Sequence, residues 1–252
     1  MSAAYGKIFF EWANLAGKRS AIALLPLVKE LVHPRNVLDV GCAHGSWLVV
    51  WSELGVEDCV GLDGYHVDRR SLLIPPGRFQ AADLSKSFNV GRRFDLVQSL
   101  EVAEHLPVGS AEEFVGCLCA HGDVVLFSAA QPGQGGVGHS NERCPSYWAG
   151  LFSAQGYVAY DCIRPYVVDD KRIDPWYRFN TVLYANAAGA SRLGPRVKEN
   201  RVDRAADLRR GGDFLWHLRC MVLQLLPEPA VTYLMRHRNR LAVASFGRGR
   251  NQ

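Results

Sequence analysis

The chain has 252 residues, 48% of them hydrophobic and 21% charged, which suffices for one large folded domain and excludes collagen, coiled-coil and disordered chains. The net charge of +4 at pH 7 is uneven, because the residues from Arg192 onward hold 13 Lys and Arg against 5 Asp and Glu. The sequence has no apolar stretch long enough to span a bilayer and no secretory-signal pattern, and its seven cysteines are scattered. We therefore expect a cytoplasmic protein with reduced thiols.

The predicted elements begin with two helices in residues 5–33, where apolar residues recur at helical spacing until His33-Pro34. Short apolar segments then alternate with helical ones. The expected helices are 46–54, 111–119 and 145–155, and the expected strands are 36–40, 59–62, 79–82, 94–100, 124–128, 157–160 and 179–184. This alternation predicts an α/β fold with a doubly wound, mostly parallel seven-stranded sheet. The last two strands have no long helix between them, so an antiparallel hairpin is expected at one edge.

The sequence divides into three predicted segments. Residues 1–34 form an N-terminal helical cap, 35–187 the main α/β domain, and 188–252 a basic helical C-terminal extension that follows a linker of small residues. Within the extension, residues 213–226 have an apolar stripe at helical spacing, and Pro227 ends that helix.

The segment VLDVGCAHGS at 37–46 carries an apolar strand into the pattern Asp-x-Gly-x-x-x-Gly and then into a helix. Glycines let the backbone turn tightly and approach a ligand, and the helix start offers free N–H groups. The pattern is not G-x-G-x-x-G, so a dinucleotide is not the natural ligand, whereas the carboxylate of Asp39 suits an ammonium group. A glycine-rich turn that binds nothing is the alternative.

Two more acids follow the next two predicted strands. Asp63 in VGLDG can accept both hydroxyls of a ribose, and Asp83 in AADL can accept from an adenine amino group. Each alone is equally well explained as a solvated loop acid. However, acids at the ends of three successive strands converge on the sheet edge where such folds bind ligands.

In this order, the motifs VLDVGCAHG, VGLDG, AADL, FDLVQSLEVAEHLP and GDVVLFSAA resemble the class I S-adenosylmethionine-dependent methyltransferases, over about residues 36–185. The resemblance implies a Rossmann-like domain with S-adenosylmethionine as cofactor. It departs from the family at His44, where a small residue is more usual. It assigns these cofactor-binding residues: Asp39, Gly41 and Gly45 for the amino-acid part, Asp63 and Gly64 for the ribose, Asp83 and Leu84 for the adenine, and Ser99 and Leu100 beside the methionine moiety.

The candidate chemical site follows the fourth predicted strand. A helical turn there would place Glu101, Glu104 and His105 on one face, and His139 could fold back beyond the Gly-rich loop at 131–136. Oxygen and imidazole ligands suit a divalent ion such as Mg²⁺, Mn²⁺ or Zn²⁺. Glu-x-x-Glu-His with a later His is similar to ubiquinone-pathway O-methyltransferases and to small-RNA terminal 2′-O-methyltransferases, which implies that all four residues are metal ligands. The alternatives are a metal-free site with His105 or His139 as general base, and packing or capping roles for both histidines.

The stretch 135–148 resembles bacterial methyltransferases of glycan and natural-product pathways, which implies a hydroxylated small molecule or sugar as acceptor. Trp148, Trp176 and Tyr177 are either walls of such a pocket or ordinary core and rim aromatics. We expect O-methylation by in-line transfer. The alternatives are N- or C-methylation of a natural product, RNA 2′-O-methylation, and a non-catalytic cofactor-binding role.

Two expectations concern partners. The acidic body and the lack of a recognisable RNA-binding module argue against a nucleic-acid partner. The basic C-terminal helix is expected to be a surface helix or a homodimer contact, and less readily a membrane-surface element.

Overall fold

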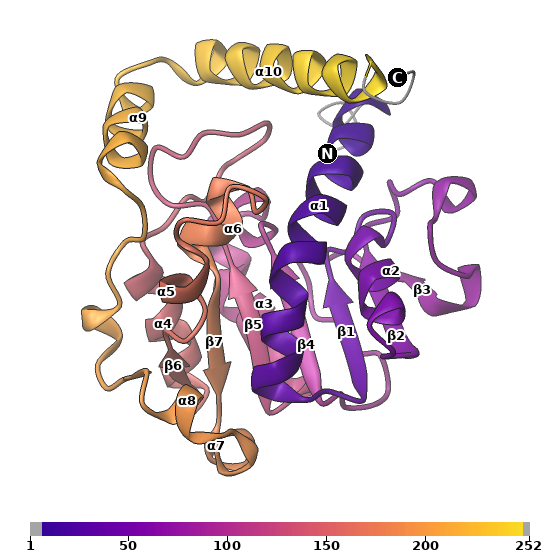
Figure 1. Ribbon diagram of the computed structural model, residues 1–252, viewed down its shortest axis with the longest axis vertical. Helices are drawn as coiled ribbons and strands as arrows, with labels where there is room; N and C mark the ends of the chain where they lie inside the picture. The colour runs from indigo at the N-terminus through magenta and orange to yellow at the C-terminus, as the bar shows by residue number, and fades with distance from the viewer. Residues whose placement is uncertain (1–6, 249–252) are drawn as a thin grey trace.

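The strands form one mixed sheet in the computed structural model, which describes residues 7–248 (Figure 1). The strand order is β3-β2-β1-β4-β5-β7-β6-β8, in which β3, β2, β1, β4 and β5 pair in parallel. The strand order reverses between β1 and β4, which is where open α/β sheets bind ligands. The strands are β1 (Asn36–Val40), β2 (Asp58–Asp63), β3 (Phe79–Ala81), β4 (Leu96–Leu100), β5 (Val124–Ser128), β6 (Val158–Tyr160), β7 (Val182–Ala185) and β8 (Arg201–Val202).

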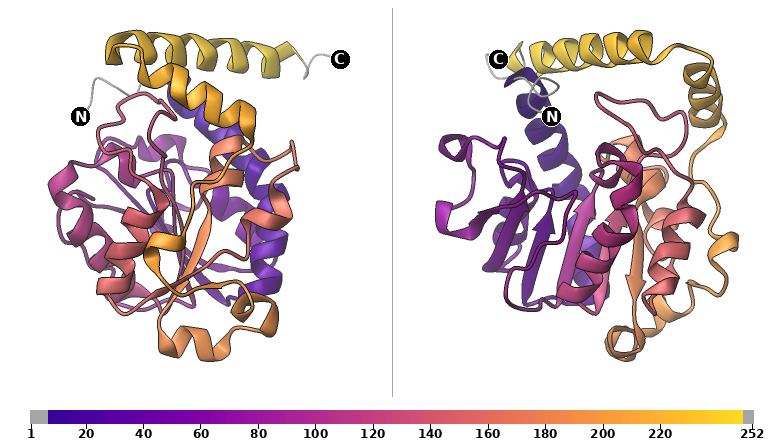
Figure 2. Two further views of the ribbon diagram at one scale, coloured as in Figure 1. Left: turned by 90° about the vertical axis from the view of Figure 1, so that its left-hand side faces the viewer. Right: turned by 180° about the vertical axis from the view of Figure 1, so that it is seen from behind.

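Helices cover both faces of the sheet (Figure 2). The α-helices are α1 (Lys7–Val32), α2 (Ser46–Glu53), α3 (Ala111–His121), α4 (Pro145–Ala154), α5 (Arg164–Val167), α6 (Pro175–Asn180), α7 (Ala187–Arg192), α8 (Pro195–Lys198), α9 (Phe214–Gln224) and α10 (Glu228–Arg248). Short 3₁₀ turns are η1 (Arg69–Ser71), η2 (Pro76–Arg78), η3 (Ala103–His105), η4 (Val108–Ser110) and η5 (Ala205–Asp207).

The core consists of two apolar layers separated by the sheet. Neighbouring strand residues face opposite sides, so Val37 packs in the layer under α1 and α2, whereas Leu38 packs in the layer under α3 and α4. Because both faces are covered, β4 and β5 are buried along their whole length. The predicted doubly wound architecture is confirmed.

The sheet has eight strands among the described residues, not the predicted seven. The additional strand is β8, which comes from the predicted C-terminal extension and pairs antiparallel with β6. It is only two residues long, so it carries no alternating pattern that a sequence analysis could detect. The expected antiparallel pair is present as β6 and β7, with β7 also antiparallel to β5.

The N-terminal segment is one continuous helix, α1, rather than the predicted pair. The expected start at residue 5 lies outside the described residues. Gly17, in the middle of α1, lets this helix approach α2, because a Cβ there would lie 3.1 Å from Ser46 Oγ and 3.2 Å from Trp47 Nε1.

The C-terminal extension folds back over the sheet. α10 lies across the top of the molecule and packs against α1 (Figure 1). α9 agrees with the predicted helix, but most of its apolar side chains face outward, while Trp216 and Cys220 are buried. Within residues 7–248, no helix is both long enough and apolar enough to cross a membrane.

Candidate active site

A cavity of about 830 Å³ opens at the carboxyl ends of β1, β2 and β4. Its walls come from the turn after β1, the segments 62–66, 80–89 and 100–106, and the loop at 134–139. Helices α1, α6, α9 and α10 complete the enclosure. The volume is typical of a small-molecule site, and its place in the sheet agrees with the reversal of strand order.

The turn after β1 has the backbone shape that its glycines permit. Gly41 and Gly45 have φ angles of 87° and 88°, in the left-handed region that favours glycine. Gly41 borders the cavity, whereas Gly45 caps the start of α2 and is not among the lining residues. The unexpected His44 does not line the cavity, and its Nδ1 lies 2.8 Å from Asn14 Nδ2 of α1. His44 therefore anchors the turn to α1.

Asp39 presents a buried carboxylate to the cavity. Its side chain is 3% exposed, and its Oδ2 has no hydrogen-bond partner in the described part of the chain. Burial raises the pKa of Asp39 to about 7. An unpartnered buried carboxylate oxygen is costly, so the site favours a ligand with a positive, hydrogen-bonding group.

Asp63 joins the end of β2 to the turn after β1. Its Oδ2 accepts from Ala43 N at 2.6 Å and its Oδ1 from Gly64 N at 2.5 Å. Burial raises the pKa of Asp63, although these backbone N–H groups oppose the rise. Each carboxylate oxygen has a second acceptor site, so Asp63 can bind hydroxyls in the cavity while holding the turn. This positioning of the turn was not predicted from the sequence.

Most, but not all, of the other predicted cofactor residues line the cavity. Asp83 and Leu84 border it, with Asp83 Oδ1 accepting from Ser85 Oγ at 2.6 Å. Leu100 also borders it, but the fully buried Ser99 does not. Strand neighbours face opposite sides of the sheet, so only one of these two can face the cavity.

Glu101 lies at the end of β4 in a left-handed conformation, with φ 57°. Its Oε2 accepts from Gln134 Nε2 at 2.5 Å and its Oε1 from Asn180 Nδ2 at 3.0 Å. The helical turn η3 begins only at Ala103, so Glu101 does not share a helical face with Glu104 and His105. The predicted four-ligand set is therefore not brought together, because Glu101 contacts amide groups instead.

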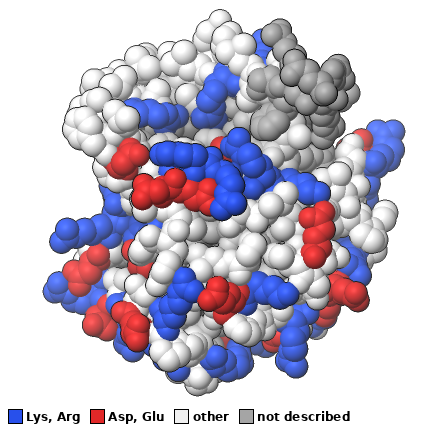
Figure 3. Space-filling model, viewed as in Figure 1, with Lys and Arg blue, Asp and Glu red and all other residues white. Residues whose placement is uncertain are grey.

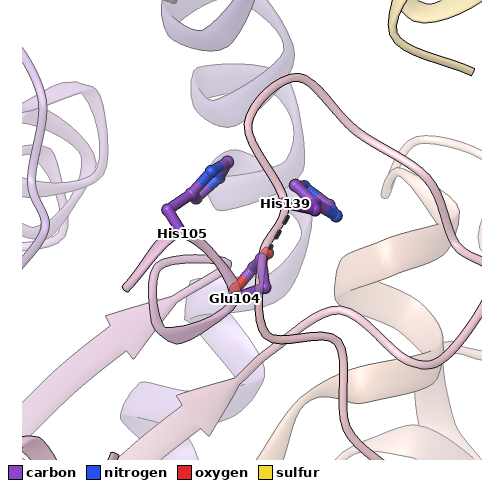
Figure 4. A group of neighbouring side chains, drawn as sticks. All are labelled: Glu104, His105 and His139. Atoms are coloured by element: carbon purple, nitrogen blue, oxygen red, sulfur yellow. Dashed lines mark ion pairs between the residues drawn. The ribbon is translucent and has the colours of Figure 1, made fainter. Parts of the chain in front are cut away.

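Glu104, His105 and His139 do come together (Figure 4). One donor atom from each lies within 4.8 Å of the other two. Glu104 is 1% exposed, its Oε2 has no partner among the described residues, and burial followed by repulsion from Glu101 raises its pKa well above the usual range. Burial, together with the nearby His139, lowers the pKa of His105 to about 3, so that ring stays neutral.

His139 is oriented by Glu142, a residue that the sequence analysis did not select. His139 Nδ1 donates to Glu142 Oε1 at 2.8 Å, while its Nε2 lies 4.0 Å from Glu104 Oε1. Glu142 also accepts from Gly133 N and Gly135 N, each at 2.8 Å. Burial opposes ionisation of Glu142, but the His139 and backbone N–H groups together lower its pKa. The sequence signal that could have identified Glu142 is its position three residues after His139.

The aromatic predictions hold only in part. Trp176 and Tyr177 border the cavity. Trp148 follows the other alternative and is a core aromatic, because its ring is buried against Phe127 at a centroid distance of 5.3 Å. The C-terminal extension supplies wall residues that sequence reasoning missed: Arg219, Met235, Arg238 and Asn239.

Residues 14–154 match the sequence profile of the methyltransferase-domain family, which is more than half of the chain. The chain belongs to this family. The identification as a class I S-adenosylmethionine-dependent methyltransferase is thereby confirmed. No curated protein sequence matches the chain.

The chain is also similar to solved structures. The methyltransferase domain of bacterial CtHen1-C is 18% identical, covers 67% of this chain and 97% of that one, and has a TM-score of 0.50. An O-methyltransferase family protein from Burkholderia thailandensis is 16% identical, with 69% and 58% covered and a TM-score of 0.49. The sugar N-methyltransferase KedS8 from Streptoalloteichus is 18% identical, with 67% and 87% covered and a TM-score of 0.49. The methyltransferase spans 58% of the Burkholderia protein and about half of two further matched chains.

The residues of the methyltransferase fit S-adenosylmethionine. Asp39 has an unpartnered oxygen that suits the ammonium group, and Asp63 retains acceptor capacity that suits the ribose hydroxyls. The left-handed Gly41 brings the backbone to the edge of the cavity without a Cβ.

We predict that S-adenosylmethionine binding by the methyltransferase depends on the ionisation of Asp39. The free carboxyl, with its pKa of about 7, is protonated at lower pH and must lose that proton to bind an ammonium group. The affinity should therefore rise from about pH 5.5 to about pH 7, by up to about tenfold per unit, and then level off. Titration calorimetry checks this, and Asp39→Asn should bind weakly with no such dependence.

The matched control for Asp39 is Asp58→Asn, at the other end of β2, where the carboxylate pairs with Arg92 outside the cavity. It should keep the wild-type profile. A wild-type affinity that does not change over the same pH range would contradict the assignment of Asp39.

Asp63→Ala should weaken S-adenosylmethionine binding by about tenfold or more, because charge-assisted hydrogen bonds worth about 1.5–3 kcal/mol are lost. The loss should exceed that of a ribose contact alone, since the turn at Ala43 also loses its anchor. Asp68→Ala is the control, because Asp68 is exposed and its side chain bonds Arg70 rather than the turn after β1. Equal affinities for the two variants would show that Asp63 does not bind the cofactor.

Proposed function

We propose that the methyltransferase methylates a hydroxyl group of a small molecule or sugar, with His139 as general base. The observation that carries the proposal is the His139–Glu142 hydrogen bond at the end of the cavity. A carboxylate that accepts from Nδ1 leaves Nε2 as the proton acceptor and fixes the ring in place. Nε2 lies 4.0 Å from Glu104 Oε1, and His139, Glu104, Trp176 and Tyr177 all line the cavity.

Each residue of the site has a separate role in the proposed reaction. S-adenosylmethionine, when bound, supplies a methyl group on a sulfonium centre. His139 Nε2 takes the proton of the acceptor hydroxyl, and Glu142 stabilises the resulting imidazolium. Burial raises the pKa of the Glu104 carboxyl well above its usual range, which favours the protonated form, and that form can donate a hydrogen bond to the acceptor. Trp176 and Tyr177 exclude water and offer flat apolar surfaces of the kind that sugar rings pack against.

A divalent ion held by Glu104, His105 and His139 is the second candidate for the same reaction. The close approach of three potential donor atoms and the unpartnered Glu104 Oε2 favour it. The ion, when bound, supplies a Lewis acid for the acceptor hydroxyl. In that case the neutral His105 ring is a ligand rather than a bystander.

Substitution and chelation distinguish the two candidates. With His139 as base, His139→Gln should lower turnover by about 10²–10⁴-fold, Glu142→Gln should lower it less, and a chelator should have no effect. With a metal, the chelator should abolish turnover, and Glu104→Gln and His105→Gln should each have the same effect. Turnover is measured as S-adenosylhomocysteine released with a panel of sugars and phenols, followed by mass spectrometry and NMR of the methylated atom.

His217→Gln is the control for these variants, because His217 is exposed on α9 and does not border the cavity. It should keep wild-type turnover. Cofactor binding without release of S-adenosylhomocysteine on any acceptor would contradict an enzymatic role. A methylated nitrogen or carbon would contradict O-methylation.

A homodimer through the C-terminal helices is also part of the proposal. The outward arc of α9 is apolar and exposed, comprising Phe214, Leu215, Leu218, Met221, Val222 and Leu225. Sedimentation at micromolar concentration should show a dimer that Leu218→Glu converts to a monomer. A monomeric wild-type protein would contradict the dimer.

A further inference from the structure

Two arginines of the C-terminal helices face the same cavity as the cofactor residues. Arg219 comes from α9 and Arg238 from α10, and both border the cavity together with Asn239. The two helices lie above the sheet, and basic side chains gather between them and the sheet on the face shown in Figure 3. The helices therefore bring two guanidinium groups to a cavity whose other lining residues include five carboxylic acids and one lysine.

Arg238 is held between two aromatic rings. Its guanidinium carbon lies 5.2 Å from the ring centroids of both Trp12 and Trp176. The hydrogen bonds of the guanidinium go to Asn239 Oδ1, at 3.2 and 3.4 Å. Burial, followed by repulsion from Arg219, lowers the pKa of Arg238 to about 10, so the group stays charged at neutral pH. Stacking on aromatic faces fixes a guanidinium without neutralising it.

Arg219 is positioned by the loop that leads to His139. Its Nη1 donates to Gln134 O at 2.8 Å, and its guanidinium carbon lies 5.1 Å from the Trp216 ring centroid. Gln134 in turn donates to Glu101. These contacts place Arg219 on the side of the cavity formed by the His139 loop.

No carboxylate among the described residues forms an ion pair with either arginine. The nearest acids have other partners, since Asp174 binds Arg19 and Ser20, and Glu142 binds His139 and two backbone N–H groups. Arg164, which is buried outside the cavity, differs from these two arginines, because its guanidinium donates to both carboxylate oxygens of Asp161 at 2.7 Å. Asp174 attracts Arg238 and Glu142 attracts Arg219 without a direct ion pair, which offsets only part of the cost of burial and of the repulsion between the two guanidinium groups. A ligand that supplies negative charge would offset the rest.

We propose that Arg219 and Arg238 bind an oxyanion, a carboxylate or phosphate, on the methyl acceptor. The planar guanidinium matches the two-oxygen edge of these groups. The proposal rests on the proposed function and adds to it the acceptor class: a hydroxylated molecule that carries a negative charge. The cofactor's own carboxylate is the competing ligand, and the position of Arg219 beside the His139 loop favours the acceptor.

The test uses the full-length protein saturated with S-adenosylhomocysteine. Inorganic phosphate and glucuronate serve as anionic probes, and glucose is the neutral counterpart of glucuronate. By ligand-observed NMR or calorimetry, at least one anion should bind at least about tenfold more tightly than glucose. Arg219→Gln and Arg238→Gln should each lower that affinity by about tenfold or more, whereas Arg238→Lys should lower it less. Which probe binds more tightly identifies the acceptor group as phosphate or carboxylate.

Arg240→Gln is the matched control, since Arg240 is exposed on α10 and does not border the cavity. It should leave anion binding unchanged, and all variants should keep S-adenosylhomocysteine binding, which also shows that they fold. Anions that bind no better than glucose would overturn the proposal, as would an equal loss in Arg240→Gln. Loss of cofactor binding in folded Arg219 and Arg238 variants would overturn it by assigning the pair to the cofactor carboxylate. Anion binding at the pair without methyl transfer to any acceptor would contradict only the proposed function.

Discussion

Asp39 and Asp63 end adjacent parallel strands, and no lysine or arginine among the described residues pairs with either carboxylate. The register between β1 and β2 aligns Asp39 with Gly61 and Val40 with Leu62, which brings the two acids to the same edge of the sheet. Asp63 uses part of its acceptor capacity to hold Ala43, so the glycine-rich turn and the acid pair form one unit. His66 Nε2 lies 3.8 Å from Asp63 Oδ1, whereas Asp39 Oδ2 has no partner among the described residues, and a buried carboxylate without a partner is stable only at a cost. A cofactor with ammonium and sulfonium groups relieves that cost, which makes this constraint the basis of the binding site.

The opposite end of the cavity balances its charges in other ways. Glu101 is held by the amides of Gln134 and Asn180, and Glu142 is held by His139 and backbone N–H groups. Glu104 Oε2 has no partner among the described residues, and burial raises the pKa of this carboxyl well above its usual range. Beyond these acids, α9 and α10 add two unpaired guanidinium groups. The cavity thus changes from negative at the cofactor residues to positive at the C-terminal helices, which suits a cationic donor and, in our proposal, an anionic acceptor.

Much of this architecture follows from local sequence patterns. Apolar strands alternating with helices predict the doubly wound sheet, and acids directly after three strands identify the cofactor edge. The remaining features depend on backbone geometry or on contacts between distant residues. The left-handed conformation of Glu101 separates it from Glu104 and has no sequence signature in a non-glycine residue. Arg238 reaches the site only because α10 folds back onto α1 and Trp12, a contact that spans most of the chain.

The most direct test of this account is a crystal structure of the methyltransferase with S-adenosylhomocysteine. The account predicts that the amino group of the ligand lies about 2.7–3.2 Å from Asp39 Oδ2 and that the ribose hydroxyls contact Asp63. It also predicts that the sulfur faces the space between Glu104 and His139. A ligand whose amino group leaves Asp39 without a partner, or whose sulfur faces away from His139, would contradict it.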